Sequence, residues 1–330
     1  MSKQIWLAPI LSDNRRRLTE HCADMLAAGE SDRFLYLTAS RPLLDVVTTA
    51  LLDGQRNRGV WGTLPVFLFR GFVRHLLATS VDAETRLPLP PRIPIDRDEL
   101  PMKRSLISQV MSRLLDEGKL NALAPVAYRE GCVNSIATLI GEIQRAAKSP
   151  AEFASIVEAR ARDLYPSAGE AGAPGTVPRQ IDFDREIGLI YSAYQAALDG
   201  SMLSDDDSDQ LRALEVLRGA LDGRRVSVPW LSHLKLVVLD GFFDFTPAQG
   251  EMLRFVLPLV PEVIVNLNRD EQNAEIFRPF ASTIEQLNSI AEFETRIERQ
   301  ARPVAEDLAP LRARLFNPSV ELVENEMRGG

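Results

Sequence analysis

Five short, nearly continuous apolar runs lie toward the two ends of the chain, and this is the pattern of strands buried in a parallel sheet. The runs are 4–9, 33–39, 65–69, 234–240 and 262–267. Apolar residues at helical spacing over 15–28 and 42–53 separate the first three runs. The resulting order of strand, helix, strand, helix and strand predicts an α/β domain with a parallel sheet and right-handed crossovers.

The middle of the chain has helical periodicity instead. A proline-dense connector over 87–101 cannot form a helix or a central strand, because proline lacks a backbone N–H and restricts the residue before it. Two capping-box patterns mark the starts of helices, one at Ser149 and Glu152 and one at Thr246 and Gln249. Apolar stripes predict further helices around 106–115, 133–143, 153–164 and 187–198.

Three polar stretches lie between or beyond these elements. The composition of 166–180 predicts a flexible loop. The acidic run 204–209 is interpreted as a solvated loop that caps a helix over 210–222, because no calcium-loop spacing with a glycine surrounds it. Beyond residue 269 the chain is polar and weakly patterned, with a helix expected over 281–302.

The pattern predicts nested rather than tandem domains. Residues 1–86 and 226–280 are expected to form one discontinuous α/β domain, with 87–225 as a helical insertion. Residues 281–330 are expected to form a C-terminal helical or irregular segment. The last residues, Met-Arg-Gly-Gly, favour a chain that continues into a missing C-terminal half.

Composition narrows the class of protein. The 330 residues are 45% hydrophobic and 25% charged, which is typical of a globular protein. A net charge of −8 excludes a strongly basic nucleic-acid coat protein, although it leaves room for a local basic groove. Cys22 and Cys132 give no disulfide framework, and no signal peptide or membrane span is evident. We therefore expect a cytoplasmic protein with no membrane partner.

The first strand runs directly into a helix, which is where a phosphate-binding loop would lie. Such a loop needs glycines whose N–H groups approach the phosphates, a lysine, and a serine or threonine for Mg²⁺. Ser12, Asp13, Asn14 and Arg15 stand there instead, without a glycine or a lysine. Asp240 ends a later strand and either holds Mg²⁺ or forms a plain strand-end turn with the glycine that follows it. These five residues define a degenerate nucleotide site.

Other enzyme chemistry finds little support. The three histidines lie far apart in the chain and have no partners at metal-ligand spacing. Glu117-Gly118-Lys119 has the letters of a nuclease motif, but it falls in a helix-end turn and not on a strand. The sequence therefore predicts no catalytic residue and no metal ligand in this chain.

One group of basic residues has the spacing of a nucleic-acid contact. Arg70 and Arg74 lie one helical turn apart beside Phe72, so the three together fit a groove that follows a DNA backbone. The alternative is that these arginines belong to a solubilising surface.

Four segments occur in an order that resembles a known family. They are 34–44 (FLYLTASRPLL), 65–72 (PVFLFRGF), 182–194 and 237–249 (VVLDGFFDFTPAQ). The last of them has the form hydrophobic-Asp-Gly-Phe-x-x-Phe-Thr-Pro. In this order the segments resemble the N-terminal helicase-like region of the AddB family, the B subunits of the bacterial ATP-dependent helicase/nuclease that processes double-strand DNA ends.

The resemblance implies a RecA-like parallel sheet of the P-loop NTPase and superfamily I helicase type, with an inserted all-helical subdomain. Family members often carry a Gly-x-Gly-Lys-Thr-like loop after the first strand. Asp13, Asn14 and Arg15 stand at its Gly, Lys and Thr, which implies that ATP and Mg²⁺ are not bound by that route. The family's PD-(D/E)XK nuclease domain, with an iron–sulfur cluster on four cysteines, has no match here, so no cofactor is expected in this chain.

We therefore expect a catalytically silent, helicase-like module in the repair of double-strand breaks. The resemblance implies a helicase/nuclease A-type subunit as the partner, and DNA ends or single-stranded DNA as the ligand. Two alternatives stay open. One is an atypical nucleotide hydrolase with Asp240 on the metal, and the other is a protein-interaction module without DNA binding.

Overall fold

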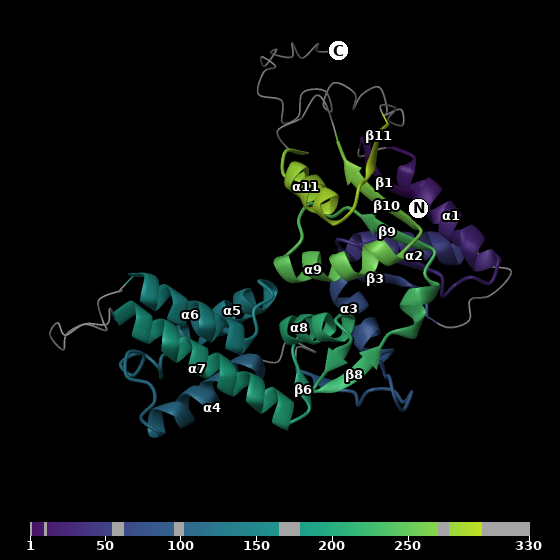
Figure 1. Cartoon of the computed structure of the whole chain (residues 1–330). Coiled ribbons are helices and arrows are strands. Elements are labelled where there is room, and N and C mark those ends of the chain that lie inside the picture. The colour runs from purple at the N-terminus through teal and green to yellow at the C-terminus, as the bar shows by residue number, and fades with distance from the viewer. Residues whose placement is uncertain are drawn as a thin grey trace, which may run out of the picture. The chain divides into compact units, whose positions relative to one another are not determined.

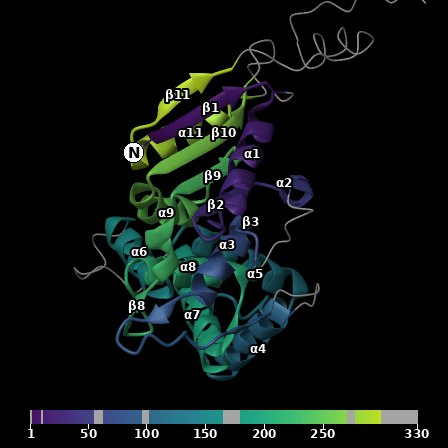
Figure 2. The same ribbon diagram turned by 90° about the vertical axis from the view of Figure 1, so that its right-hand side faces the viewer.

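The chain divides into two compact units, whose elements are labelled in Figures 1 and 2. In this computed structural model, residues 2–9, 12–54, 63–95, 102–164, 179–269 and 277–298 are described. The first unit, here the α/β unit, comprises Met1–Phe69, Trp230–Phe245 and Val256–Gly330. The second, here the helical unit, comprises Arg70–Pro229 and Thr246–Phe255.

A six-stranded sheet forms the centre of the α/β unit. Every neighbouring pair is parallel, in the order β11-β1-β10-β9-β2-β3. All five predicted strands are confirmed, and their side chains are largely buried, as expected for a parallel sheet. The strands are β1 (Ser2–Ala8), β2 (Phe34–Thr38), β3 (Val66–Leu68), β9 (Leu236–Asp240), β10 (Glu262–Asn268) and β11 (Glu294–Ile297).

The sixth strand corrects the expectation of a helix over 281–302. Helix α11 (Phe280–Ile290) ends well before that limit, and β11 follows it and pairs with β1. All four β11 residues are exposed. An edge strand of this kind carries no apolar run, so the hydrophobic pattern could not reveal it.

Two helices cover one face of the sheet. Helix α1 (Asn14–Ala27) and helix α2 (Arg41–Gly54) follow β1 and β2, as the periodicity predicted. Their apolar side chains join alternate residues of four strands in one buried cluster: Leu18, Cys22, Met25, Val47, Leu51, Phe34, Tyr36, Val66, Leu236, Val238 and Ile264. Alternation along the strands places Tyr36 on the same face as α1.

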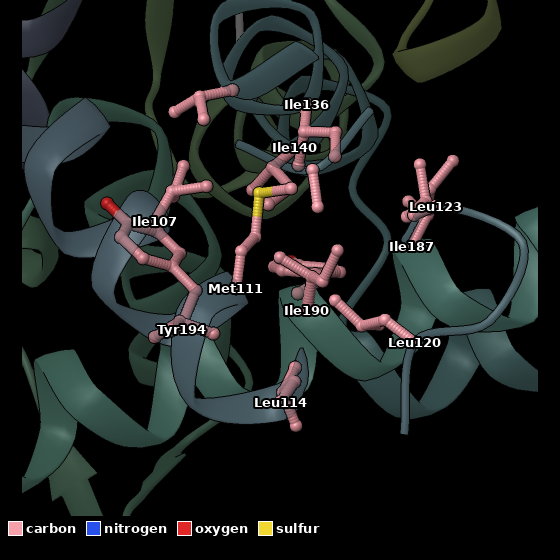
Figure 3. Packing of buried hydrophobic residues seen from close by; sticks show 14 of the residues in the cluster. Ile107, Met111, Leu114, Leu120, Leu123, Ile136, Ile140, Ile187, Ile190 and Tyr194 are labelled. Atoms are coloured by element: carbon pink, nitrogen blue, oxygen red, sulfur yellow. The ribbon is translucent and has the colours of Figure 1, made fainter. Parts of the chain in front are cut away.

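The predicted apolar stripes are confirmed as the core of the helical unit. Figure 3 shows side chains such as Met111, Ile140 and Ile190 packed against one another, and all three are buried. No helix among the described residues is both long and apolar enough to cross a membrane. The helices are α3 (Phe69–Ala78), α4 (Met102–Asp116), α5 (Glu130–Arg145), α6 (Pro150–Leu164), α7 (Arg179–Gly200), α8 (Asp206–Leu217) and α9 (Pro247–Val256).

Short strands complete the helical unit. The predicted helix over 210–222 begins earlier, at Asp206, and ends at Leu217. A tight hairpin follows, and its two turn residues, Asp222 and Gly223, adopt positive φ angles of 50° and 74°, as an Asp-Gly hairpin turn requires. The sheets are β4-β8-β7, with β4 (Val81–Asp82), β7 (Ala220–Leu221) and β8 (Arg224–Ser227), and β5-β6, with β5 (Ile93–Pro94) and β6 (Leu203–Ser204). Most of the predicted loop over 166–180 lies outside the described residues.

The acidic run 204–209, whose last four residues form the first turn of α8, caps that helix as predicted, but it is largely shielded from solvent. The carboxylate of Asp205 accepts the N–H of Ser208 at 2.6 Å, and Asp205 is fully buried. Lys103 lies 3.3 Å from this carboxylate, and Arg145 lies 3.1 Å from that of Asp207. These cations come from α4 and α5, so the acidic run is held inside the unit by partners that are distant in sequence.

The two predicted capping boxes are confirmed. Glu152 accepts the N–H of Ser149 at 2.8 Å, and Ser149 accepts the N–H of Glu152 at 3.3 Å. Gln249 accepts the N–H of Thr246 at 3.1 Å, and Thr246 accepts the N–H of Gln249 at 3.3 Å. Each pair satisfies two N–H groups at the start of its helix, α6 or α9.

Candidate functional site

The site forms around one buried carboxylate at the end of β9. Asp240 has no exposed surface. Its Oδ2 accepts hydrogen bonds from Arg15 Nε at 2.8 Å and from the Tyr36 hydroxyl at 2.9 Å. Its Oδ1 accepts from Asn266 Nδ2 at 2.7 Å and, more weakly, from Arg15 Nη2 at 3.4 Å. One carboxylate thus joins α1, β2, β9 and β10.

The sheet topology brings these residues together. Asp240 pairs in register with Asn266 on β10, so both side chains lie at the carboxyl edge of the sheet. Arg15 is the second residue of α1, and α1 starts at that same edge because it follows β1. Tyr36 lies lower on β2, opposite Val238, and its long side chain reaches up to the carboxylate. The edge where parallel strands end is the usual ligand-binding edge of such folds.

The electrostatics of the site favour a stable ion pair between Arg15 and Asp240. Burial opposes the charge of Arg15, but the hydrogen bond and the charge of Asp240 prevail and raise the guanidinium pKa above its ordinary value. Burial, and then the negative charge of Asp240, raise the pKa of Tyr36 well above its ordinary value. Tyr36 therefore remains protonated and acts as a hydrogen-bond donor.

The carboxylate has no bonding capacity left over. An ionised carboxylate offers about four lone-pair positions, and Asp240 receives four hydrogen bonds. Arg15 also supplies the positive charge that a metal ion would otherwise bring. In this arrangement the residues do not fit Mg²⁺, because a metal ion would have to displace at least one of these donors.

The structure brings together some of the predicted nucleotide-site residues and not others. Arg15 and Asp240 are in direct contact. Asp13 instead lies 3.5 Å from Arg16, and Asn14 is buried at the start of α1. The N–H of Ser12, two residues before the helix, donates to the carbonyl of Pro9 at 2.9 Å.

Sequence reasoning missed two of the three residues that donate hydrogen bonds to Asp240, namely Tyr36 and Asn266. Each is a polar side chain inside an otherwise apolar strand, in FLYLT and EVIVNLN. A buried polar group needs a hydrogen-bonding partner, so these interruptions were a usable signal. Nothing in the pattern identified the partner, because that depends on strand order.

The turn after Asp240 depends on glycine. Gly241 has a φ of +80°, and a Cβ there would lie 3.1 Å from Leu43 Cδ2. Its N–H donates to the carbonyl of Asn266 at 3.0 Å. Beyond the turn, the rings of Phe242 and Phe245 stack with centroids 5.0 Å apart. The Asp-Gly-Phe signature is therefore a strand-end turn, as one of the two interpretations of Asp240 expected, and it is also a packing motif.

The predicted DNA-contact residues lie in a different environment from the one expected. Phe72 is fully buried, so its ring cannot stack on a base, and this part of the prediction is corrected. Arg74 Nη2 contacts Asp206 at 2.5 Å, and Arg70 Nη1 lies 4.0 Å from the same carboxylate. Only Arg70 keeps a mostly exposed side chain, at 62%.

The nuclease-like triplet is a surface feature. Lys119 Nζ lies 2.7 Å from Glu117 Oε2, and both side chains are about half exposed. Within the part of the chain that the structure describes, no cluster of three or more His, Cys, Asp or Glu residues could hold a metal ion.

The fold and site together define a class: an α/β protein with a six-stranded parallel sheet, a separate helical unit, and an acidic strand end closed by an arginine. The sequence profile of the family described as "ADDB, N-terminal" matches residues 101–317, about two thirds of the chain. The chain therefore belongs to the AddB N-terminal family, as its sequence indicated.

A curated relative agrees with this assignment. Over 181 residues the chain is 28% identical to a protein of Moorella thermoacetica described as the B-type subunit of an ATP-dependent helicase/deoxyribonuclease. The match covers 52% of this chain but only 14% of that relative. The chain thus corresponds to a small part of the relative's length.

Proposed function

We propose that this chain is the catalytically silent, helicase-like N-terminal module of an AddB-type helicase/nuclease. It acts as a scaffold for an A-type helicase/nuclease subunit and guides a DNA strand during double-strand-break repair in the bacterial cytoplasm. Its membership of the AddB N-terminal family supports the class. The name of the Moorella relative, which includes both helicase and deoxyribonuclease, supports DNA as the ligand.

Strand order supports a RecA-like sheet. The strand before the first helix, β1, and the strand with the terminal acid, β9, both lie inside the sheet and are separated only by β10. Their carboxyl ends therefore share one edge, at which a nucleotide-binding ancestor would hold phosphate and metal. In this chain that edge carries the Arg15–Asp240 pair.

One observation supports the proposal that this module does not hydrolyse nucleotides. The carboxylate of Asp240 is fully buried and already accepts four hydrogen bonds. Because Arg15 neutralises it from within the chain, the site is complete without a nucleotide. The turn before α1 also offers no lysine and no glycine for phosphate binding.

An ATPase assay discriminates this proposal from an atypical nucleotide hydrolase. We expect the wild-type chain, Asp240→Ala and the exposed-acid control Asp45→Ala to give the same background phosphate release. Magnesium-dependent hydrolysis that falls by orders of magnitude in Asp240→Ala alone would overturn the proposal. The DNA-guiding role is tested separately, by binding of single-stranded DNA that weakens as salt is added.

A further inference from the structure

A loop between α4 and α5 presents an aromatic and a basic side chain on a rigid support. Three of its residues, Leu120, Leu123 and Ala127, are inserted into the core and are at most 4% exposed. Tyr128 follows Ala127, the last of these three buried residues, and is therefore directed outward. Its exposed fraction is 75%, the largest of any large hydrophobic side chain in the described part of the chain.

A buried carboxylate fixes this loop from below. Glu186 on α7 is only 5% exposed. It accepts the backbone N–H groups of Asn121, Ala122 and Leu123 at 2.6, 2.7 and 2.8 Å. Three charge-assisted hydrogen bonds to consecutive residues leave this stretch of backbone little freedom. A rigid loop loses little conformational entropy when a ligand binds to it.

Turn hydrogen bonds extend this order to the end of the loop. Val126 N–H donates to the Leu123 carbonyl, and Arg129 N–H donates to the Val126 carbonyl, each at 2.9 Å. The anchored stretch is therefore continuous with Tyr128 and with the start of α5. The Tyr128 ring is held on a supported backbone and not on a free tail.

The surroundings of Tyr128 combine apolar surface with positive charge. Arg129 is exposed and lines an open groove of about 750 Å³, together with Val126 and Phe183. The one acid in the lining, Glu130, lies 3.8 Å from Arg104 Nη1, which offsets its charge. Arg129 directly follows Tyr128 in the chain, so an exposed guanidinium group and an exposed ring lie on the same supported loop.

From this juxtaposition we propose that the loop over 120–129 is a contact site for single-stranded DNA. One base stacks on the Tyr128 ring, and Arg129 binds the adjacent phosphate, while Arg104 offsets the charge of Glu130. A nucleotide matches this surface because it joins a flat apolar base to an anion. The inference rests on the proposed function, and it supplies a contact that Phe72, being buried, cannot.

The test measures fluorescence anisotropy of a labelled oligo(dT) strand with the whole chain at about 50 mM salt. Tyr128→Ala is expected to weaken binding roughly 5-fold to 100-fold, as when one base loses its aromatic partner, whereas Tyr128→Phe retains binding. Arg129→Ala is expected to lower the slope of log affinity against log salt by about 0.7. Two controls remove comparable groups elsewhere: Phe243→Ala, another largely exposed ring, and Arg160→Ala, an exposed arginine.

The outcomes separate this site from the proposed function. If the chain binds DNA and Tyr128→Ala binds as tightly as Phe243→Ala, the site is wrong while DNA guiding stands. If Tyr128→Ala leaves DNA affinity intact and weakens only the association with an A-type subunit, the loop is a protein contact and the inference fails. If the wild-type chain binds no DNA at low salt, DNA guiding itself fails. An unchanged thermal unfolding midpoint in Tyr128→Ala excludes misfolding as the cause of any loss.

Discussion

Removing the Arg15 guanidinium tests whether the Asp240 site is held together by that arginine. Arg15→Ala deletes two of the four hydrogen bonds on a fully buried carboxylate and also its counter-charge. Breaking a buried ion pair by removing one partner costs about 3–5 kcal/mol. Because the Arg15 side chain is 36% exposed, water replaces part of the lost interaction, so we expect a loss of about 2–3 kcal/mol in the free energy of unfolding.

The neighbouring arginine provides the matched control. Arg16 also lies in the first turn of α1, but its side chain is 55% exposed and its partners, Asp13 and Glu20, are 36% and 58% exposed. Solvent screens surface pairs of this kind, so Arg16→Ala should be nearly neutral. Both variants are compared by urea unfolding followed by far-UV circular dichroism.

A double-mutant cycle then isolates the pair. In an Asp240→Asn background the carboxylate charge is absent, so the additional cost of Arg15→Ala should fall below about 1 kcal/mol. Coupling of about 1–2 kcal/mol between the two positions is the expected result. Equal, small costs for Arg15→Ala and Arg16→Ala, with no coupling to Asp240, would refute the reasoning.

Two further predictions concern the helical unit. Glu186→Ala leaves three backbone N–H groups of the 120–129 loop without their acceptor, and should lower the free energy of unfolding by about 2–4 kcal/mol, while Glu186→Gln recovers part of the loss. Burial raises the pKa of Asp209 to about 6, above its ordinary value near 3.8, so the folded chain holds this proton more tightly and loses stability as pH rises from about 4 to 6. Asp209→Asn should flatten the stability curve in that window when urea unfolding is measured at a series of pH values, and an unchanged pH profile would contradict this account.

Much of the fold could be predicted because its strongest elements follow simple physical rules. Parallel strands covered on both faces must be apolar throughout, so five of the six strands of the main sheet stand out in the sequence. The helices of the core can be predicted for a similar reason, because each buries one face and therefore carries an apolar stripe at helical spacing. β11 was not predicted because it is an exposed edge strand without an apolar run.

The site could be predicted only in part. Arg15 and Asp240 were found because each occupies a topologically special place, the start of a helix or the end of a strand. Tyr36 and Asn266 become partners of Asp240 only through strand order, which no local pattern encodes. The acidic run at the start of α8 was wrongly expected to be solvated for the same reason. Its counter-charges include Lys103, which lies about a hundred residues away in sequence.

The central claim is that the Asp240 site of this module is complete without a nucleotide, and calorimetry tests it most directly. Isothermal titration of the wild-type chain with ATP and Mg²⁺ should show no binding heat beyond dilution, because the turn before α1 lacks the phosphate-binding residues and Asp240 is already paired with Arg15. Saturable binding of Mg²⁺–ATP in the micromolar range would contradict the account.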